Sequence, residues 1–217
     1  MTASQPLRTM MVDTQVRPSD VTKFPIIAAM LDVPREDYVP AAARSVAYMD
    51  APVAMGDGRE VPEARTLAKM LDALEISRDD SVLIVGGGLG YSTAILARMA
   101  ASVVMVEEDG ALASEAESTL AQHDVLNAVV LEGALTEGAA KAGPFDVIVI
   151  EGGVELVPEA LSAQLRDGGR IAAVFQTGAL GEVRVGQAAA SGLSWRFAFN
   201  ATAPVLPGFA AERAFTL

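Results

Sequence analysis

The sequence contains no cysteine and only one histidine, His123. Without thiols the chain has no disulfide, cysteine nucleophile, thiolate metal site or iron–sulfur cluster. A single imidazole is too few for a multi-histidine metal site, so no bound metal is expected. The absence of cysteine suits a reducing compartment, and we expect a cytoplasmic protein.

Basic residues and long apolar runs are also scarce. Sixteen Lys and Arg stand against 28 Asp and Glu, which gives a formal net charge of −12. This balance repels phosphate backbones and anionic headgroups, so neither a nucleic acid nor a membrane surface is expected as a partner. The longest β-like apolar runs have four to five residues, far below the ~20 that span a bilayer. The N-terminus has no apolar run of signal-peptide length.

Hydrophobic residues make up 51% of the 217-residue chain, enough for the core of one domain. We expect one domain over residues 1–217, and a monomer by default. It would consist of a helical N-terminal cap (1–80), a cofactor-binding core (81–176) and C-terminal edge strands (177–217).

Five short apolar runs predict the strands of the core. Because they are continuous, not alternating, they indicate strands buried on both faces of a parallel sheet, and they are too short for buried helices. The segments between them suit helices, so the pattern predicts a doubly wound α/β sheet. The strands are expected at Val82–Val85, Val103–Val106, Ala128–Leu131, Val147–Ile150 and Ile171–Phe175, and the helices at Tyr91–Met99, Ala111–Ala121 and Pro158–Leu165.

The flanking segments have other patterns. Residues 64–74 carry apolar side chains at helical spacing, with Pro62 near the expected start, and Phe24–Leu31 is a second candidate helix. The last forty residues predict edge strands that are antiparallel in part. These are expected at Leu180–Val185, Trp195–Ala203 and Ala214–Leu217.

A glycine-rich turn, Gly86-Gly87-Gly88-Leu89-Gly90, follows the first core strand and precedes a helix. Glycines allow positive φ and a close approach of a ligand to the main chain. The spacing of Gly86, Gly88 and Gly90 matches an S-adenosylmethionine loop. Tyr91 stands where a dinucleotide fold has its third glycine, which disfavours a nicotinamide cofactor. A tight turn without a ligand remains an alternative.

Acidic residues follow the second core strand. Glu107 lies 21 residues after Gly86, where a carboxylate can accept hydrogen bonds from both ribose hydroxyls. Glu108 is included among the candidate cofactor residues, although with Asp109 it also suits a solvated helix start.

Several further motifs resemble the protein-L-isoaspartate O-methyltransferase family, and the similarity covers nearly the whole chain. The resemblance implies a Rossmann-like class I methyltransferase fold, with S-adenosylmethionine as methyl donor and S-adenosylhomocysteine as product. It implies an enzyme of protein repair whose acceptor is the carboxylate of an isoaspartyl residue in a damaged protein or peptide. The motifs are Met30–Pro40, Ala47–Pro52, Met55–Gly58, the glycine turn, Pro144–Asp146 and Gln164–Arg170.

The sequence departs from the family at its working positions. Pro62 replaces the serine associated with catalysis and Glu60 replaces a threonine, so no catalytic residue is assigned. Gly133 and Ala134 stand at the cofactor-binding Gly-Asp of the family, where Ala134 replaces the aspartate that helps to hold adenine. Ile84 replaces an acid on the first strand.

The fourth core strand is followed by Glu151-Gly152-Gly153, where the family has Thr-Ala-Ala. The two glycines are expected to widen the mouth of the site, and Arg59 to pair with Glu60 or Glu151. Two alternatives to isoaspartyl methylation remain: a methyltransferase for another acceptor, such as a cationic one, and an inactive relative that binds a ligand or a protein. Outside the site, Tyr91 is expected beneath the glycine turn, His123 at the surface and Trp195 in core or edge packing.

Overall fold

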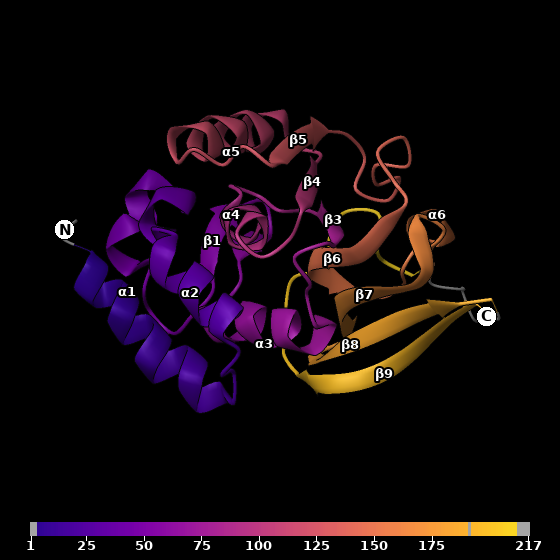
Figure 1. The fold of residues 1–217 in the computed structure, drawn as a ribbon, viewed down its shortest axis with the longest axis horizontal. Helices are drawn as coiled ribbons and strands as arrows, with labels where there is room; N and C mark the ends of the chain where they lie inside the picture. Colours follow the sequence, from indigo (N-terminus) through magenta and orange to yellow (C-terminus); the bar gives the residue numbers. More distant parts are fainter. Residues whose placement is uncertain (1–3, 191, 212–217) are drawn as a thin grey trace, which may run out of the picture.

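The computed structural model describes residues 4–190 and 192–211, and its centre is a seven-stranded sheet (Figure 1). The strand order is β5-β4-β3-β6-β7-β8-β9. Neighbours from β5 to β7 are parallel, and β8 and β9 continue the sheet antiparallel. The strands are β3 (Ser81–Val85), β4 (Ser102–Glu107), β5 (Ala128–Glu132), β6 (Phe145–Val154), β7 (Leu165–Thr177), β8 (Leu180–Ala189) and β9 (Gly192–Asn200).

The apolar runs form strands because their side chains alternate between two buried faces. In β3, Val82 and Ile84 join one core cluster while Leu83 and Val85 join the other. The expected burial on both faces is therefore confirmed for β3. It is wrong for β5, where Val129 is 55% exposed, because β5 lies at the edge of the sheet.

Helices cover the two faces unequally. One core cluster joins the sheet to the N-terminal helices and to α3, α4 and α5, which stand to the left and above the sheet in Figure 1. The other face is covered by the segment 135–143, the single turn of α6 and residues 205–209. The helix expected over 158–165 is too long, because Leu165 already pairs with Phe145 in the sheet. The helices of the core are α4 (Tyr91–Ala97), α5 (Gly110–Gln122) and α6 (Glu159–Ser162).

Most elements in the first 80 residues are helices, and one short hairpin lies among them. A hairpin of β1 (Val53–Gly56) and β2 (Arg59–Val61) makes its own two-stranded antiparallel sheet, and the sequence analysis did not predict it. The α-helices are α1 (Gln5–Met11), α2 (Phe24–Asp32) and α3 (Ala64–Leu74); shorter π and 3₁₀ segments are η1 (Val12–Val16), η2 (Arg17–Ser19), η3 (Arg35–Tyr38) and η4 (Ala41–Val46).

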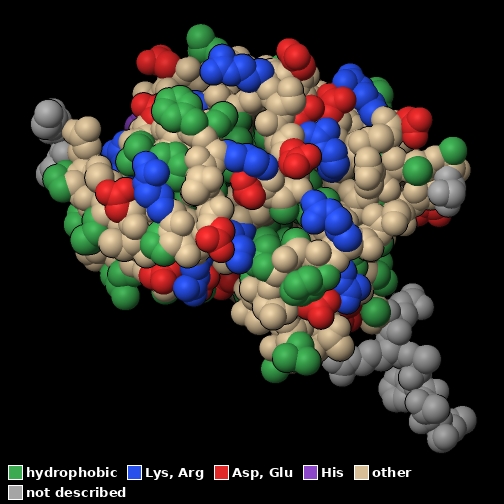
Figure 2. Space-filling model, turned by 60° about the horizontal axis from the view of Figure 1, so that its bottom comes forward, with side chains coloured by type: hydrophobic (Ala, Val, Ile, Leu, Met, Phe, Trp, Pro, Cys, Tyr) green, Lys and Arg blue, Asp and Glu red, His purple; other side chains and the backbone are tan. Residues whose placement is uncertain are grey.

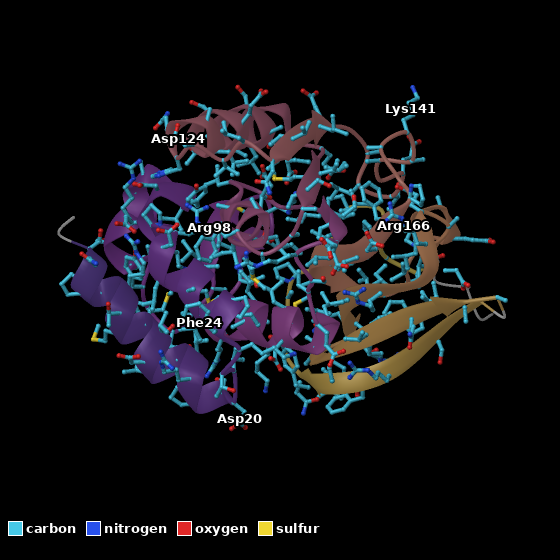
Figure 3. All side chains as sticks on the ribbon, in the orientation of Figure 1. Asp20, Phe24, Arg98, Asp124, Lys141 and Arg166 are labelled. Atoms are coloured by element: carbon cyan, nitrogen blue, oxygen red, sulfur yellow. The ribbon has the colours of Figure 1, made fainter. Side chains whose placement is uncertain are left out.

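Arginine side chains fasten the cap to the core. Arg98, labelled in Figure 3, follows α4 and pairs with Asp32 at the end of α2. Arg170 of β7 donates to the carbonyl oxygens of Leu74 and Glu75 at 2.9 and 3.1 Å and to Asp80 at 2.7 Å. It thereby satisfies carbonyls that the C-terminal end of α3 leaves without helical partners.

The expected C-terminal strands are confirmed as the β8–β9 hairpin, although β9 ends at Asn200. Trp195 packs edge-on against Phe175, with ring centroids 4.7 Å apart, as expected for edge packing. The strand expected at Ala214–Leu217 lies outside the described residues. On the face in Figure 2, Lys and Arg side chains are interspersed with Asp and Glu. Within the described ranges, no helix has both the length and the apolarity needed to cross a membrane.

Candidate active site

The glycine turn joins the end of β3 to the start of α4. Gly86, Gly88 and Gly90 adopt φ values of 76°, 55° and 89°, which explains why glycine stands at each position. The strand order reverses at β3, with β4 on one side and β6 on the other. A crevice outside the carboxyl ends of the strands is expected at such a switch point, where open α/β sheets bind ligands.

The carboxylate of Glu107 lies directly against this turn. It is fully buried at the end of β4, and its Oε2 accepts a hydrogen bond from the backbone N–H of Gly88 at 2.9 Å. Its Oε1 accepts from the N–H groups of Glu108 and Asp109 at 3.0 and 3.2 Å. The structure thus brings together the glycine turn and the acid that the sequence analysis placed beside it.

Arg59 of β2 binds both oxygens of this carboxylate. Two of its nitrogens lie 2.9 Å from Oε1 and Oε2 of Glu107, and one also donates to the carbonyl oxygen of Gly86 at 2.9 Å. Burial alone would lower the pKa of Arg59, but the hydrogen bonds and charge of Glu107 raise it. The expectation that Arg59 pairs with Glu60 or Glu151 is wrong, because its side chain turns toward the buried acid.

Met55 of β1 covers the turn next to this ion pair. Its Cε lies 2.6 Å from the position that a Cβ on Gly88 would occupy, so any side chain there would have to displace Met55. The two strands of the hairpin therefore each place one side chain on the glycine turn, Met55 from β1 and Arg59 from β2.

This arrangement does not fit the ribose of a nucleoside cofactor. Glu107 already accepts five hydrogen bonds, two from Arg59 and three from backbone N–H groups. A carboxylate offers about four lone-pair sites. Neither oxygen of Glu107 is therefore left for the ribose hydroxyls while Arg59 holds its position.

The other candidate cofactor residues surround this centre. Gly87 is held closely, because a Cβ there would lie 2.8 Å from Sδ of Met105. Gly133 donates its N–H to the carbonyl oxygen of Glu107 at 3.0 Å, while Ala134 is exposed. Glu108 is also exposed. Their roles toward a cofactor stay predictions.

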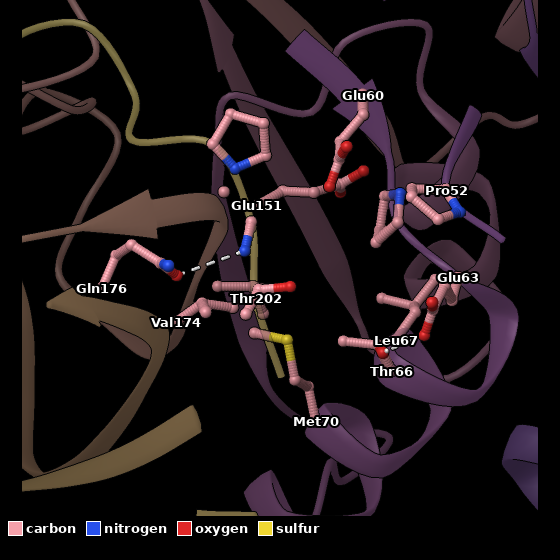
Figure 4. Close-up of a pocket in the computed structure, with 15 residues that line it drawn as sticks. Pro52, Glu60, Glu63, Thr66, Leu67, Met70, Glu151, Val174, Gln176 and Thr202 are labelled. Carbon is pink, nitrogen blue, oxygen red and sulfur yellow. Dashed lines mark hydrogen bonds between the residues drawn. The ribbon is translucent and has the colours of Figure 1, made fainter. Parts of the chain in front are cut away.

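A cavity of about 390 Å³ lies beside the glycine turn (Figure 4). It brings Glu60, Pro62 and Glu151 together from β2, the segment after β2, and β6. Gly86 follows Val85, which pairs with Ile150 of β6, so the turn lies next to Glu151 in the cavity wall. The remaining lining residues are Pro52, Glu63, Thr66, Leu67, Met70, Val149, Gly152, Val174, Gln176, Thr202, Ala203 and Pro204.

Glu151 is the most perturbed acid of the cavity. Glu151 is 7% exposed, and burial raises its pKa to about 7. The hydroxyl of Ser92 and the charges of Arg59 and Arg35 act in the opposite direction and lower this pKa. Ser92 donates a hydrogen bond to this carboxylate. Ser92 was not predicted as a site residue, although its position in the first turn of the helix after the glycine turn is visible in the sequence.

Glu60 and Glu63 also line the cavity, and their surroundings differ from each other. Burial and the neighbouring charge of Glu63 raise the pKa of Glu60. Glu63 is engaged, because its Oε2 accepts from Arg65 at 3.0 Å and from Thr66 at 3.1 Å. Glu60 and Glu151 both line this cavity (Figure 4). The cavity is therefore acidic and otherwise largely apolar.

The structure also places the residues that were expected at the mouth of the site, beneath the turn and at the surface. Gly152 and Gly153 do not widen the mouth: a Cβ on either would meet atoms of residues 203–206 at 2.5 Å, so they let that segment pack against β6. Tyr91 is buried as expected, with the guanidinium of Arg35 4.7 Å from its ring centroid. The side chain of His123 is only 26% exposed, and its Nε2 lies 3.1 Å from Oδ2 of Asp37. His123 is therefore partly buried, whereas it was expected at the surface.

The fold and this turn define a class of protein. The sheet is mixed, and its parallel part has a glycine turn after its central strand, β3, and an acid at the end of the neighbouring β4. This is a Rossmann-like fold of the class I methyltransferase type. A family profile, "Protein-L-isoaspartate(D-aspartate) O-methyltransferase (PCMT)", matches residues 9–185. The chain belongs to this family of S-adenosylmethionine-dependent methyltransferases, which confirms the resemblance found in the sequence.

Individual relatives agree. The chain is 36% identical over 164 residues to "Protein-L-isoaspartate O-methyltransferase 1" of Rhodopseudomonas palustris, covering 76% of this chain and 67% of the relative. A Plasmodium falciparum structure, described as a protein-L-isoaspartate O-methyltransferase in complex with S-adenosyl-L-homocysteine, has a TM-score of 0.79. It is 18% identical, covering 95% of this chain and 99% of that one.

A further solved structure, named protein-L-isoaspartate O-methyltransferase, has a TM-score of 0.79 at 21% identity. That match covers 94% of this chain but only 66% of the other, so this chain spans just under two thirds of that protein. At these identities the two structures establish the fold.

Proposed function

We propose that this protein transfers a methyl group from S-adenosylmethionine to the side-chain carboxylate of isoaspartyl residues in proteins or peptides. The observation that carries the proposal is that the glycine turn lies next to the cavity wall at Glu151, which also accepts a hydrogen bond from Ser92 of α4. A donor bound at the turn and an acceptor bound in the cavity would be neighbours, and proximity and orientation supply a large part of such a reaction's rate.

The acidity of the cavity is compatible with a carboxylate acceptor if Glu151 carries its proton. Its pKa of about 7 leaves a large protonated fraction near neutrality, and a protonated carboxyl group donates a hydrogen bond. We assign Glu151 this role of holding the acceptor. Repulsion from Glu60 is then the main remaining obstacle to acceptor binding.

We further propose that the protein works in the cytoplasm as a monomer, on protein or peptide substrates and without a metal. The absence of cysteine and the net charge of −12 support this setting.

The test is methyl transfer from S-adenosylmethionine at millimolar concentration to a pair of peptides that differ only in one isoaspartyl or aspartyl linkage. Base-labile methyl ester should form on the isoaspartyl peptide alone. Equal labelling of both peptides, or labelling of neither, contradicts the proposed function. Labelling of amine-bearing peptides instead would identify a cationic acceptor, in agreement with the acidic cavity.

A further inference from the structure

We propose that Arg59 is an internal competitor of the cofactor, which occupies the ribose position of the S-adenosylmethionine site and must leave Glu107 before the cofactor binds. This inference rests on the cofactor assigned under the proposed function. It gives the β1–β2 hairpin the role of a closed lid over the glycine turn.

The competition follows from the contacts of Arg59. Its side chain is 7% exposed, and its guanidinium bonds bidentately to the fully buried carboxylate of Glu107 and to the carbonyl oxygen of Gly86. Such planar two-point pairing is the strongest arrangement between these side chains. Two ribose hydroxyls would offer two hydrogen bonds to the same oxygens, but no charge.

The positive charge of Arg59 favours it over the cofactor's ribose as the partner of the Glu107 carboxylate. A buried carboxylate that loses its only cationic partner carries a large desolvation cost. The cofactor's ribose does not repay that cost, so the closed arrangement is favoured. If only a fraction of molecules has Arg59 released, the apparent affinity for the cofactor falls by that fraction.

The hairpin is built as a separate unit. Within the described residues, β1 and β2 pair with each other and with no strand of the large sheet. Pro52 and Pro62 flank the hairpin, and three consecutive residues at its tip have positive φ: Gly56, Asp57 and Gly58. Met55 rests on Gly88 from the same hairpin. Moving this one unit would clear both the acid and the glycine turn.

The decisive measurement is calorimetric titration with S-adenosylhomocysteine of the wild type and the Arg59→Gln variant. We expect Arg59→Gln to bind at least about tenfold more tightly. Arg184→Gln is the matched control, because Arg184 pairs with Glu182 at 2.9 Å on β8 and its side chain is 41% exposed. It should bind like the wild type. Equal or weaker binding by a folded Arg59→Gln variant overturns the proposal.

Arg59→Gln leaves the buried carboxylate of Glu107 without its cationic partner, which destabilises the fold. Two further measurements therefore test the proposal in proteins that keep this ion pair. Met55→Ala keeps the ion pair and uncovers Gly88, and it should bind several-fold more tightly than the wild type. In the wild type, saturating S-adenosylhomocysteine should speed hydrogen exchange at residues 53–61 and slow it at residues 86–90. Slower exchange in the hairpin on binding, or no change there, contradicts a lid that opens.

The same variants separate this inference from the proposed function. Tighter binding by Arg59→Gln without methylation of the isoaspartyl peptide upholds the role of Arg59 and rejects the proposed activity. Methylation by the wild type, with equal affinities in both proteins, upholds the activity and rejects the role of Arg59. Binding by neither protein at millimolar ligand also rejects it.

Discussion

Ser92 and Glu151 connect the glycine turn to the cavity. Ser92 stands in the first turn of α4, two residues after Gly90, and its hydroxyl donates to the Glu151 carboxylate on β6. Arg59 and Arg35 also act on this carboxylate through their charges. Release of Arg59 from Glu107 would therefore reach the acceptor side of the site through the protonation of Glu151.

The raised pKa of Glu151 predicts a pH-dependent stability. An acid whose folded pKa is about 7, against 4.5 in the unfolded chain, stabilises the fold fully below pH 4.5 and loses this contribution as pH rises through 7. The loss amounts to about 3 kcal/mol of unfolding free energy. In Glu151→Gln this loss should disappear. Denaturant unfolding between pH 4.5 and 8 measures it.

Glu159→Gln, at an exposed glutamate of α6, is the control for that series and should keep the wild-type pH profile. Parallel profiles for the wild type and Glu151→Gln would contradict the assignment of the raised pKa to Glu151.

Glu60 should oppose the binding of a carboxylate acceptor. Two like charges ~4 Å apart repel by about 4 kcal/mol at an effective dielectric near 20, and partial exposure reduces this. We expect Glu60→Gln to lower KM for an isoaspartyl peptide by about tenfold with little change in kcat. Glu63→Gln is matched, because Glu63 lines the same cavity but already pairs with Arg65. A similar fall in KM for both variants would deny Glu60 a specific role.

Pro62 stands where the family resemblance places a catalytic serine. Its carbonyl oxygen accepts a hydrogen bond from the Arg35 side chain at 2.8 Å, and a serine would keep this contact while adding a hydroxyl at the cavity. A donor aimed at developing charge contributes about 10²–10³ in rate. Pro62→Ser should therefore raise kcat on an isoaspartyl peptide by about 10². Pro52→Ser, at the cavity's other hairpin-flanking proline, should not; no gain at position 62 would reject the lost-serine account.

Gly153 should tolerate no side chain. A Cβ there would lie 2.5 Å from the carbonyl oxygen of Ala203, a backbone atom, while a Cβ on Gly133 would meet nothing within 4 Å. Overpacking of this kind costs about 1–3 kcal/mol. Thermal and urea unfolding should show Gly153→Ala destabilised by that amount and Gly133→Ala near the wild type. Equal stabilities would mean that residues 203–206 shift freely.

The core of the fold could be predicted from the sequence because each of its strands contains a short, continuous apolar run. The run Val82–Val85 is apolar throughout and buried on both faces, and the positive φ values of the glycine turn demand glycine. The position of Glu107 beside that turn follows from the parallel pairing of β3 and β4, which sequence spacing alone indicates.

The hairpin and its contacts could not be predicted in the same way. β1 and β2 have four and three residues, too short for a periodic pattern. The pair of Arg59 and Glu107 joins residues 48 apart, and local sequence does not tell which acid a cation will reach. A general rule was nevertheless available: a carboxylate buried at a strand end needs a charged or multiply donating partner.

The bonds of Arg170 limit how far any motion of the hairpin spreads. Because Arg170 ties the end of α3 to β7 and to Asp80, the helix that carries Thr66, Leu67 and Met70 is anchored to the sheet at its far end. If the hairpin moves as we propose, the wall formed by α3 stays in place while the wall formed by β2 moves. An acceptor bound against α3 would keep its position while the donor site opens and closes. The structure of the pocket would then impose no order on the binding of the two substrates.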